Sequence, residues 1–261
     1  MSSFPYKHVL LIGGTSGIGL AMANRLLEGG FKVTVVGRRQ DRLDEFVRMN
    51  GKEKASGVAF DIADMKAIPG FVESVTKQFP DIECVFFNAG VQHMYDMTDP
   101  AKFNLDQFQN EVSVNFNSFV ALTHAFLPFL TEKDTTTSFI FTGSHIAIVP
   151  AFPMPAYCAS KAALNVFTLC LREQLSKTNV KVIEISPPVV QTELHDYMGE
   201  EKGRSMGMPV SQFVEAAFDG LVAGKDTIII GSAGPAEEFN DILDKRRAAF
   251  DGMTKLVRGR F

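Results

Sequence analysis

The chain has 261 residues, of which 46% are hydrophobic and 21% are charged. This composition is ordinary for a soluble globular protein and excludes disordered, collagen-like and coiled-coil chains. With 26 basic and 30 acidic residues, the formal net charge of −4 argues against non-specific nucleic-acid binding, which needs a basic surface.

Three cysteines, Cys84, Cys158 and Cys170, are spaced neither as a disulfide framework nor as metal ligands. We therefore expect reduced thiols, no metal site and a cytoplasmic location. The apolar run Val9–Ile12 is too short for a signal-peptide core. The longer apolar stretch Ser118–Leu130 is interrupted by polar residues and a proline, so we expect no membrane association.

Short β-branched runs alternate with helical patterns along most of the chain. The runs predict seven strands, at residues 8–12, 32–36, 57–60, 83–87, 138–141, 181–185 and 227–230. The helical patterns lie at residues 18–28, 42–49, 67–78, 103–130 and 156–176. Apolar strands that alternate with helices form a parallel sheet covered on both faces. We therefore expect an α/β fold, a Rossmann-type doubly wound parallel seven-stranded sheet, in a single domain over residues 1–261.

Residues from about 192 to 209 depart from this alternation. Prolines bracket the segment, which is long for a connection and carries glycine and methionine. Long insertions in compact domains are usually lids or binding loops, so we expect a partly helical substrate lid here. Further on, the charged residues between Asp241 and Arg247 predict the solvated face of a helix.

The first predicted strand runs into Gly13-Gly14-Thr15-Ser16-Gly17-Ile18-Gly19, and a helix follows. Such glycines let the backbone approach a pyrophosphate, and the helix N-terminus supplies N–H groups and a positive dipole. The spacing G-x-x-x-G-x-G differs from the general dinucleotide fingerprint. A purely structural turn is the alternative, but the position between strand and helix favours cofactor binding.

The end of the second predicted strand carries the signal for cofactor choice. It reads Val36-Gly37-Arg38-Arg39, with no carboxylate before Asp41. A carboxylate there would hold the ribose 2′-hydroxyl of NAD, whereas an arginine pairs with the 2′-phosphate of NADP. We therefore predict NADP(H) and assign Arg38 to the phosphate. The role of Arg39 stays open, and the alternative is that both arginines are solvated at a helix start.

Tyr157 and Lys161 lie four residues apart at a predicted helix start, which puts them on one helical face. A phenol has a pKa near 10, and lowering it to roughly 7 takes on the order of 4 kcal/mol. One cation at about 4 Å supplies energy of that order at an effective dielectric of about 20. The pair therefore predicts an acid/base group that exchanges a proton with a carbonyl or an alcohol.

Taken together, the motifs resemble the short-chain dehydrogenase/reductase family in its compact single-domain form. The resemblance spans nearly the whole chain. It is carried by the glycine turn and Tyr157-x-x-x-Lys161, and by further matching segments in the family's order: Asp61-Ile62, Asn88-Ala89-Gly90, Val114-Asn115, Ser144 and Pro187-Pro188-Val189-Val190-Gln191-Thr192.

The resemblance implies a role for each matching residue. Tyr157 is the implied acid/base, Lys161 lowers its pKa and holds the nicotinamide ribose, Ser144 binds the substrate carbonyl, and Asn115 supports a proton relay through a helix kink. The implied cofactor ligands are Gly13, Thr15, Ser16, Gly17, Ile18, Gly19, Asp61, Ile62, Asn88, Ala89, Gly90, Tyr157, Lys161, Pro187, Val190 and Thr192, in addition to Arg38.

Three positions depart from the family's pattern, namely Ile12, Phe87 and Pro188. The first two replace supporting polar residues. Pro188 stands where glycine is usual, so it restricts the backbone and removes an N–H beside the nicotinamide. This departure alters the wall of the substrate pocket and weakens analogies with other members' substrates.

Apolar side chains before Tyr157 and in the lid predict an apolar substrate pocket, suited to a hydrophobic or mid-sized carbonyl compound. Its predicted residues are His145, Phe152, Met154, Pro188, Leu194, Tyr197 and Met198. For His145, and for His93 after the Asn-Ala-Gly turn, a hydrogen-bonded loop histidine is the alternative. For the apolar residues the alternative is ordinary core.

The helical stretches 116–130 and 162–171 are apolar on nearly all sides, whereas a helix flanking a sheet needs one apolar stripe. A two-fold-related subunit would cover the second face, so we expect a homodimer or homotetramer. The predicted function is an NADP(H)-dependent carbonyl reductase or alcohol dehydrogenase acting on a small molecule. The alternatives are a non-catalytic cofactor sensor on the same fold, and an epimerase or dehydratase.

Overall fold

The computed structural model describes residues 4–259 and contains a seven-stranded sheet with the strand order β3-β2-β1-β4-β5-β6-β7. Every neighbouring pair is parallel. The strands are β1 (His8–Ile12), β2 (Lys32–Gly37), β3 (Ala55–Ala59), β4 (Cys84–Phe87), β5 (Thr137–Thr142), β6 (Val180–Ser186) and β7 (Thr227–Ile229). The predicted doubly wound Rossmann-type sheet is confirmed, and its order reverses between β1 and β4, where ligands bind in such folds.

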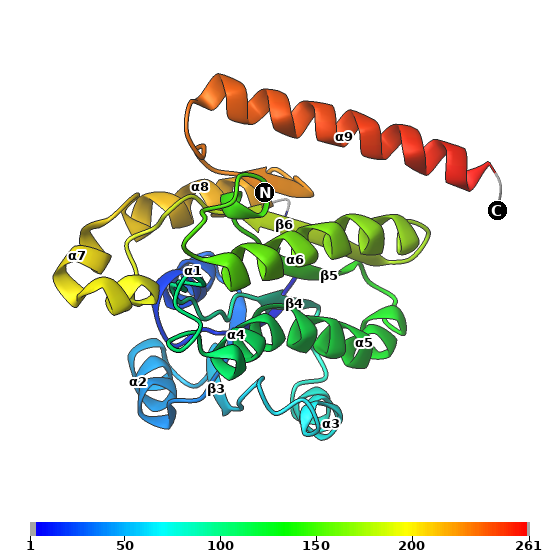
Figure 1. The fold of residues 1–261 in the computed structure, drawn as a ribbon. Coiled ribbons are helices and arrows are strands. Elements are labelled where there is room, and N and C mark those ends of the chain that lie inside the picture. The colour runs from blue at the N-terminus through cyan, green and yellow to red at the C-terminus, as the bar shows by residue number, and fades with distance from the viewer. Residues whose placement is uncertain (1–3, 260–261) are drawn as a thin grey trace. The chain divides into compact units, whose positions relative to one another are not determined.

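Helices connect successive strands (Figure 1). They are α1 (Gly17–Glu28), α2 (Gln40–Asn50), α3 (Ile68–Gln78), α4 (Leu105–Val112), α5 (Ser118–Thr131), α6 (Pro155–Gln174), α7 (Glu200–Ser205), α8 (Val210–Val222) and α9 (Ala236–Arg258). Shorter turns are the π-helical η1 (Ser113–Asn117) and the 3₁₀ helices η2 (His145–Ala147) and η3 (Glu193–Met198).

Alternation along β1 explains why helices cover both faces of the sheet. All five residues of β1 are buried. Val9 and Leu11 belong to a core shared with α1, α2 and α8. Leu10 and Ile12 point the other way, into a core shared with α3, α5 and α6. Because successive side chains of a strand alternate between faces, a strand that is apolar throughout needs a layer of helices on each side.

The structure differs from the predicted elements in two helical regions and at the ends of several elements. The helix predicted over residues 103–130 is divided into α4, η1 and α5. The helix α8 was not predicted, although its apolar residues form one buried stripe on the core. The third strand begins two residues earlier than predicted, at Ala55. Periodicity alone locates element boundaries only to within a few residues.

The contacts divide the chain into two compact units, Met1–Ile230 and Gly231–Phe261. The first unit holds the whole sheet. The second consists mainly of α9, whose predicted solvated face carries the i, i+4 ion pairs Lys245–Asp241 and Arg247–Asp251. None of the helices in residues 4–259 is long and apolar enough to cross a membrane.

Candidate active site

A chain of hydrogen bonds joins the glycine turn to Lys161 across the carboxyl ends of β1, β4 and β5. The side-chain amide of Asn88 donates to the Gly13 carbonyl at 3.2 Å and accepts from the Thr142 hydroxyl at 2.9 Å. The Thr142 carbonyl in turn accepts from Lys161 Nζ at 2.8 Å. Residues far apart in sequence are thus held at the edge where the strand order reverses.

At the glycine turn, backbone segments approach one another so closely that there is no room for side chains on the glycines. A Cβ on Gly13, whose φ is +87°, would lie 2.4 Å from the Ala89 nitrogen, and a Cβ on Gly19 would lie 2.0 Å from the Gly13 carbonyl oxygen. Helix α1 starts after Ser16 without a side-chain cap on its first N–H groups. An uncapped helix N-terminus beside bare backbone is a suitable site for an anion, so the turn fits a dinucleotide pyrophosphate.

The two arginines after β2 have different partners. Arg39 donates to the hydroxyls of Ser16 at 2.8 Å and Thr15 at 3.0 Å. The exposed Arg38 lies 3.7 Å from the carboxylate of Asp61. The residue whose role the sequence left open is therefore the one that contacts the glycine turn. The neighbouring Ile62, an implied adenine contact, is buried in the core.

Tyr157 and Lys161 lie on the first turns of α6, and both side chains are buried. The ammonium nitrogen of Lys161 is 5.6 Å from the centroid of the Tyr157 ring. Burial lowers the pKa of Lys161 to about 8, and the charge of Glu184 opposes this fall. Burial, together with nearby Glu111, raises the pKa of Tyr157 above its usual value. The polypeptide by itself therefore does not produce the lowered pKa of the Tyr157 phenol that the sequence predicts.

Glu184 is a buried carboxylate that the sequence analysis did not identify. It lies in the middle of β6, where it accepts from Asn165 Nδ2 at 2.9 Å and from Thr168 Oγ1 at 2.7 Å. A Cβ on Gly143 would come within 2.4 Å of its Oε1. A charged residue inside an otherwise apolar strand, Val-Ile-Glu-Ile, was the available signal, because buried charges need partners.

Asn115 lies at the centre of the π-helical turn η1 and is fully buried. Its side-chain amide pairs with the backbone of Val91 in both directions, each at 2.9 Å, and also donates to Ser160 Oγ at 3.2 Å. The kink expected at Asn115 is therefore present as a single π turn, a feature frequent at functional sites. It connects the segment after β4 to α6 beside Tyr157.

Ser144 follows β5 and is the N-cap of η2, where its hydroxyl accepts from the Ile146 N–H at 3.4 Å. Its neighbour His145 is buried, and its backbone N–H donates to the Pro187 carbonyl at 3.1 Å. The loop after β5 is thereby joined to the turn after β6. Both loops lie at the same edge of the sheet as Lys161.

A second buried carboxylate, Glu111 of α4, was also missed. Its Oε2 accepts from His93 Nδ1 at 2.7 Å and from the Tyr95 hydroxyl at 3.0 Å. Within residues 4–259, Oε1 has no hydrogen-bond partner. Burial raises the pKa of Glu111 above its usual range, despite these two donors. The available signal was His93, for which the sequence analysis weighed a place in the active site against a hydrogen-bonded loop histidine.

The structure brings together some of the predicted substrate-pocket residues. Gln92 donates to the Tyr197 hydroxyl at 3.0 Å and also contacts the Met154 sulfur, so the lid touches the segments before Tyr157. Phe152, by contrast, is 95% exposed. The other predicted residues lie in η3 or in the turn before it: Leu194, Met198 and Pro188.

The lid segment is held at both of its ends. Val190 and Met208 form a parallel bridge at its base. Beyond Val190, Thr192 is the N-cap of η3, and its side chain would lie 3.2 Å from a Cβ on Gly17. Thr192 and the glycine turn, both implied cofactor ligands, are therefore neighbours.

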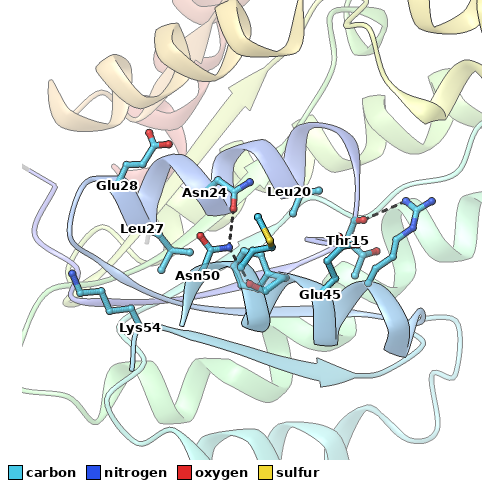
Figure 2. Close-up of a pocket in the computed structure, with 11 residues that line it drawn as sticks. Thr15, Leu20, Asn24, Leu27, Glu28, Glu45, Asn50 and Lys54 are labelled. Atoms are coloured by element: carbon cyan, nitrogen blue, oxygen red, sulfur yellow. Dashed lines mark hydrogen bonds between the residues drawn. The ribbon is translucent and has the colours of Figure 1, made fainter. Parts of the chain in front are cut away.

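A groove between α1 and α2 begins beside the glycine turn (Figure 2). Thr15 lies at one end of it and Lys54 at the other, and Asn24 and Asn50 are hydrogen-bonded at 3.2 Å between them. Tyr157 and Lys161 do not line it. The groove is therefore separate from Tyr157 and Lys161 and adjoins the glycine turn.

Comparisons with known proteins agree with this geometry. The sequence pattern described as short chain dehydrogenase matches residues 7–203. The chain is 34% identical over 247 residues to the uncharacterized oxidoreductase DltE of Bacillus subtilis, covering 93% of each protein.

Two solved structures are similar to this fold. A short-chain dehydrogenase from Sphingobium yanoikuyae in complex with NADPH gives a TM-score of 0.79 at 22% identity, covering 94% of this chain and 95% of that one. A short chain dehydrogenase/reductase from Burkholderia phymatum in complex with NAD gives 0.78 at 18% identity, covering 88% and 90%.

Proposed function

Because the chain belongs to the short-chain dehydrogenase/reductase family, we propose that it is an NADP(H)-dependent carbonyl reductase or alcohol dehydrogenase with Tyr157 as the acid/base. The observation that carries the proposal is the buried Lys161, which lies over the Tyr157 ring and is tied through Thr142 and Asn88 to the glycine turn. This arrangement joins a proton-transfer group to a dinucleotide site.

When bound, the nicotinamide cofactor supplies or accepts the hydride. In reduction, Tyr157 donates its phenolic proton to the carbonyl oxygen, and in oxidation it takes a proton from the alcohol. The high pKa that burial gives this phenol suits proton donation. The Lys161 ammonium stabilises the phenolate left behind, and the Ser144 hydroxyl holds the substrate oxygen.

The arginines after β2 support NADP(H) over NAD(H). The solved relatives hold NADPH in one case and NAD in the other, so the fold leaves this choice open. In this chain Arg39 reaches the Ser16 and Thr15 hydroxyls, and no carboxylate occupies the end of β2. We assign the 2′-phosphate to Arg39 with Arg38 beside it.

The lid supports an apolar carbonyl substrate. Met154 and Tyr197 are brought together through Gln92, and methionine adapts its shape to varied apolar ligands. The second apolar face of α6 supports a homodimer or homotetramer.

The first test is NADPH consumption with a panel of ketones and aldehydes. We expect turnover with apolar members of the panel and a loss of about 10²–10⁴-fold in Tyr157→Phe, because the variant keeps the ring and lacks the proton. Cofactor affinity, measured by fluorescence, should stay within about threefold of wild type. An epimerase or a cofactor sensor would consume no NADPH, and near-normal turnover in Tyr157→Phe would refute the proton role.

The second test concerns the cofactor. Arg39→Ala should weaken NADPH binding by on the order of tenfold or more, because a charge-assisted hydrogen bond contributes about 1.5–3 kcal/mol. NADH binding should change little. Arg38→Ala should have a smaller effect, since its contact with Asp61 is exposed. Equal loss of NADH and NADPH binding in Arg39→Ala would mean that the arginine supports the turn and does not select the phosphate.

A further inference from the structure

The first residue of η3 places a carboxylate among the arginines at the cofactor end of the site. The two oxygens of Glu193 accept from Arg42 Nη1 at 2.8 and 2.9 Å. One of them also accepts from Arg39 Nη1 at 3.2 Å. Burial alone would raise the pKa of Glu193, but these hydrogen bonds outweigh it and hold the pKa below its usual value. The carboxylate is therefore ionised and shared by two guanidinium groups.

The same two arginines also reach the glycine turn. Arg39 contacts the Ser16 and Thr15 hydroxyls through its other terminal nitrogen, Nη2, and Arg42 Nη1 lies 3.4 Å from the Thr15 carbonyl oxygen. Two guanidinium groups and two hydroxyls form a donor set suited to a phosphate monoester. Carboxylate and phosphate are the two anions that an arginine fork pairs with, so one can replace the other here.

Building on the proposed NADP(H) specificity, we propose that Glu193 is a stand-in for the cofactor's 2′-phosphate and limits, from within the lid, how strongly the protein favours NADP(H). In the cofactor-free protein its carboxylate occupies donors of Arg39 and Arg42 and offsets one of their two positive charges. The 2′-phosphate takes over these arginines when NADP(H) binds, because two anions at one arginine pair repel each other. The phosphate thereby releases η3 from α2.

The position of Glu193 in the lid links this exchange to the substrate side. Thr192, directly before it, lies against Gly17 of the glycine turn. Tyr197, at the other end of η3, bonds to Gln92 beside the residues that precede Tyr157. Glu193 therefore tethers the cofactor end of the lid, and Tyr197 tethers the substrate end. Releasing the first tether leaves the second in place and lets the lid adjust to the bound cofactor.

The test compares two small probes that differ only in the phosphate, adenosine 2′,5′-bisphosphate and 5′-AMP, by calorimetry at one fixed salt concentration. Glu193→Gln keeps the side-chain shape and removes the competing charge. We expect it to bind the bisphosphate about tenfold more tightly than wild type and to bind 5′-AMP with unchanged affinity.

The matched control is Glu200→Gln. Glu200 lies in the same lid and pairs with Arg204 at 2.7 Å, and no ion pair within residues 4–259 joins it to Arg39 or Arg42. Glu200→Gln changes the net charge of the protein, and that of the lid, by the same amount as Glu193→Gln does. Its affinity for both probes should equal that of wild type, and a matching gain in this control would reduce the Glu193 effect to long-range electrostatics and overturn the proposal.

Hydrogen exchange of peptides covering residues 193–205 gives a readout independent of affinity and activity. In wild type, the bisphosphate should speed exchange in this segment and 5′-AMP should not. In Glu193→Gln, exchange should already be fast without any probe. Exchange that stays slow in the variant would show that Glu193 does not tether the lid.

The outcomes separate this inference from the proposed function. If wild type prefers the bisphosphate and Arg39→Ala abolishes that preference, while Glu193→Gln binds it no more tightly than wild type, the stand-in role alone is wrong. If wild type binds both probes equally and Arg39→Ala changes nothing, the NADP(H) assignment itself is wrong.

Discussion

Two buried carboxylates act on the two members of the proposed acid/base pair. The charge of Glu184 supports the ammonium of Lys161, whereas the charge of Glu111 disfavours the phenolate of Tyr157. Neither carboxylate contacts its target directly by a hydrogen bond among residues 4–259. The protonation of Tyr157 is therefore set by burial and by through-space charge, and the chain alone keeps the phenol in its proton-donating form.

Replacing Glu111 should change the pH dependence in one direction. Glu111→Gln removes a negative charge that raises the pKa of Tyr157, so the phenolate forms at lower pH. We expect the acid limb of the alcohol-oxidation profile to move to lower pH. At a fixed pH on that limb, the rate should rise roughly three- to tenfold, the size of one screened charge–charge interaction. The measurement is kcat against pH with saturating cofactor.

The control for this variant is Glu132→Gln at the exposed end of α5. It removes the same charge far from α4 and should leave the profile unchanged. A Glu111→Gln profile that moves to higher pH, or stays in place with an unchanged unfolding temperature, would contradict the electrostatic role of Glu111.

At the scale of elements, the close packing of α1 on β1 decides the geometry of the cofactor turn. Gly19→Ala would place its Cβ 2.0 Å from the Gly13 carbonyl oxygen, so the helix would have to move away from the strand. We expect destabilisation by about 1–3 kcal/mol, the usual cost of overpacking. NADPH affinity should also fall by at least about tenfold. Thermal unfolding and cofactor titration measure the two effects.

Gly70→Ala in α3 is the matched control, since a Cβ there would meet no atom within 4 Å. A helical glycine replaced by alanine in open space should stabilise the protein by roughly 0.5–1 kcal/mol. If both variants gave similar stability and NADPH affinity, the close approach at Gly19 would not matter for the turn.

At the scale of the whole molecule, the outer face of α6 bears on the proposed oligomer. Val166 is half exposed, and Cys170 is exposed one turn later on the same helix. We expect wild type to be a dimer or tetramer and Val166→Glu to shift its mass towards the monomer, because two buried like charges would face each other across a two-fold axis. Light scattering at micromolar concentration checks this.

Met49→Glu on α2 serves as the control for that experiment. Met49 is an exposed apolar residue on a helix of the other core, so its replacement should leave the mass unchanged. A monomeric wild type would contradict the expected association outright. An oligomer that survives Val166→Glu would place the interface elsewhere than the outer face of α6.

Local pattern in the amino-acid sequence predicted the seven strands and the motifs of the site. These properties are local, because strand alternation, the glycine turn and the spacing of Tyr157 and Lys161 depend on neighbouring residues. The family resemblance also implied a helix kink at Asn115. The helical pattern around it, by contrast, predicted one continuous helix over residues 103–130, and the structure has a π turn there.

The pairing of charges that are distant in sequence became visible in the folded chain. In the structure, Glu193 forms ion pairs with Arg39 and Arg42, and Glu111 pairs with His93. Glu184 lies near enough to Lys161 for its charge to act on the ammonium. The structure also showed that Arg39, whose role the sequence left open, contacts the glycine turn. The physical reason is that a long-range contact depends on the packing of elements, and the pKa of each group depends on the burial that this packing produces.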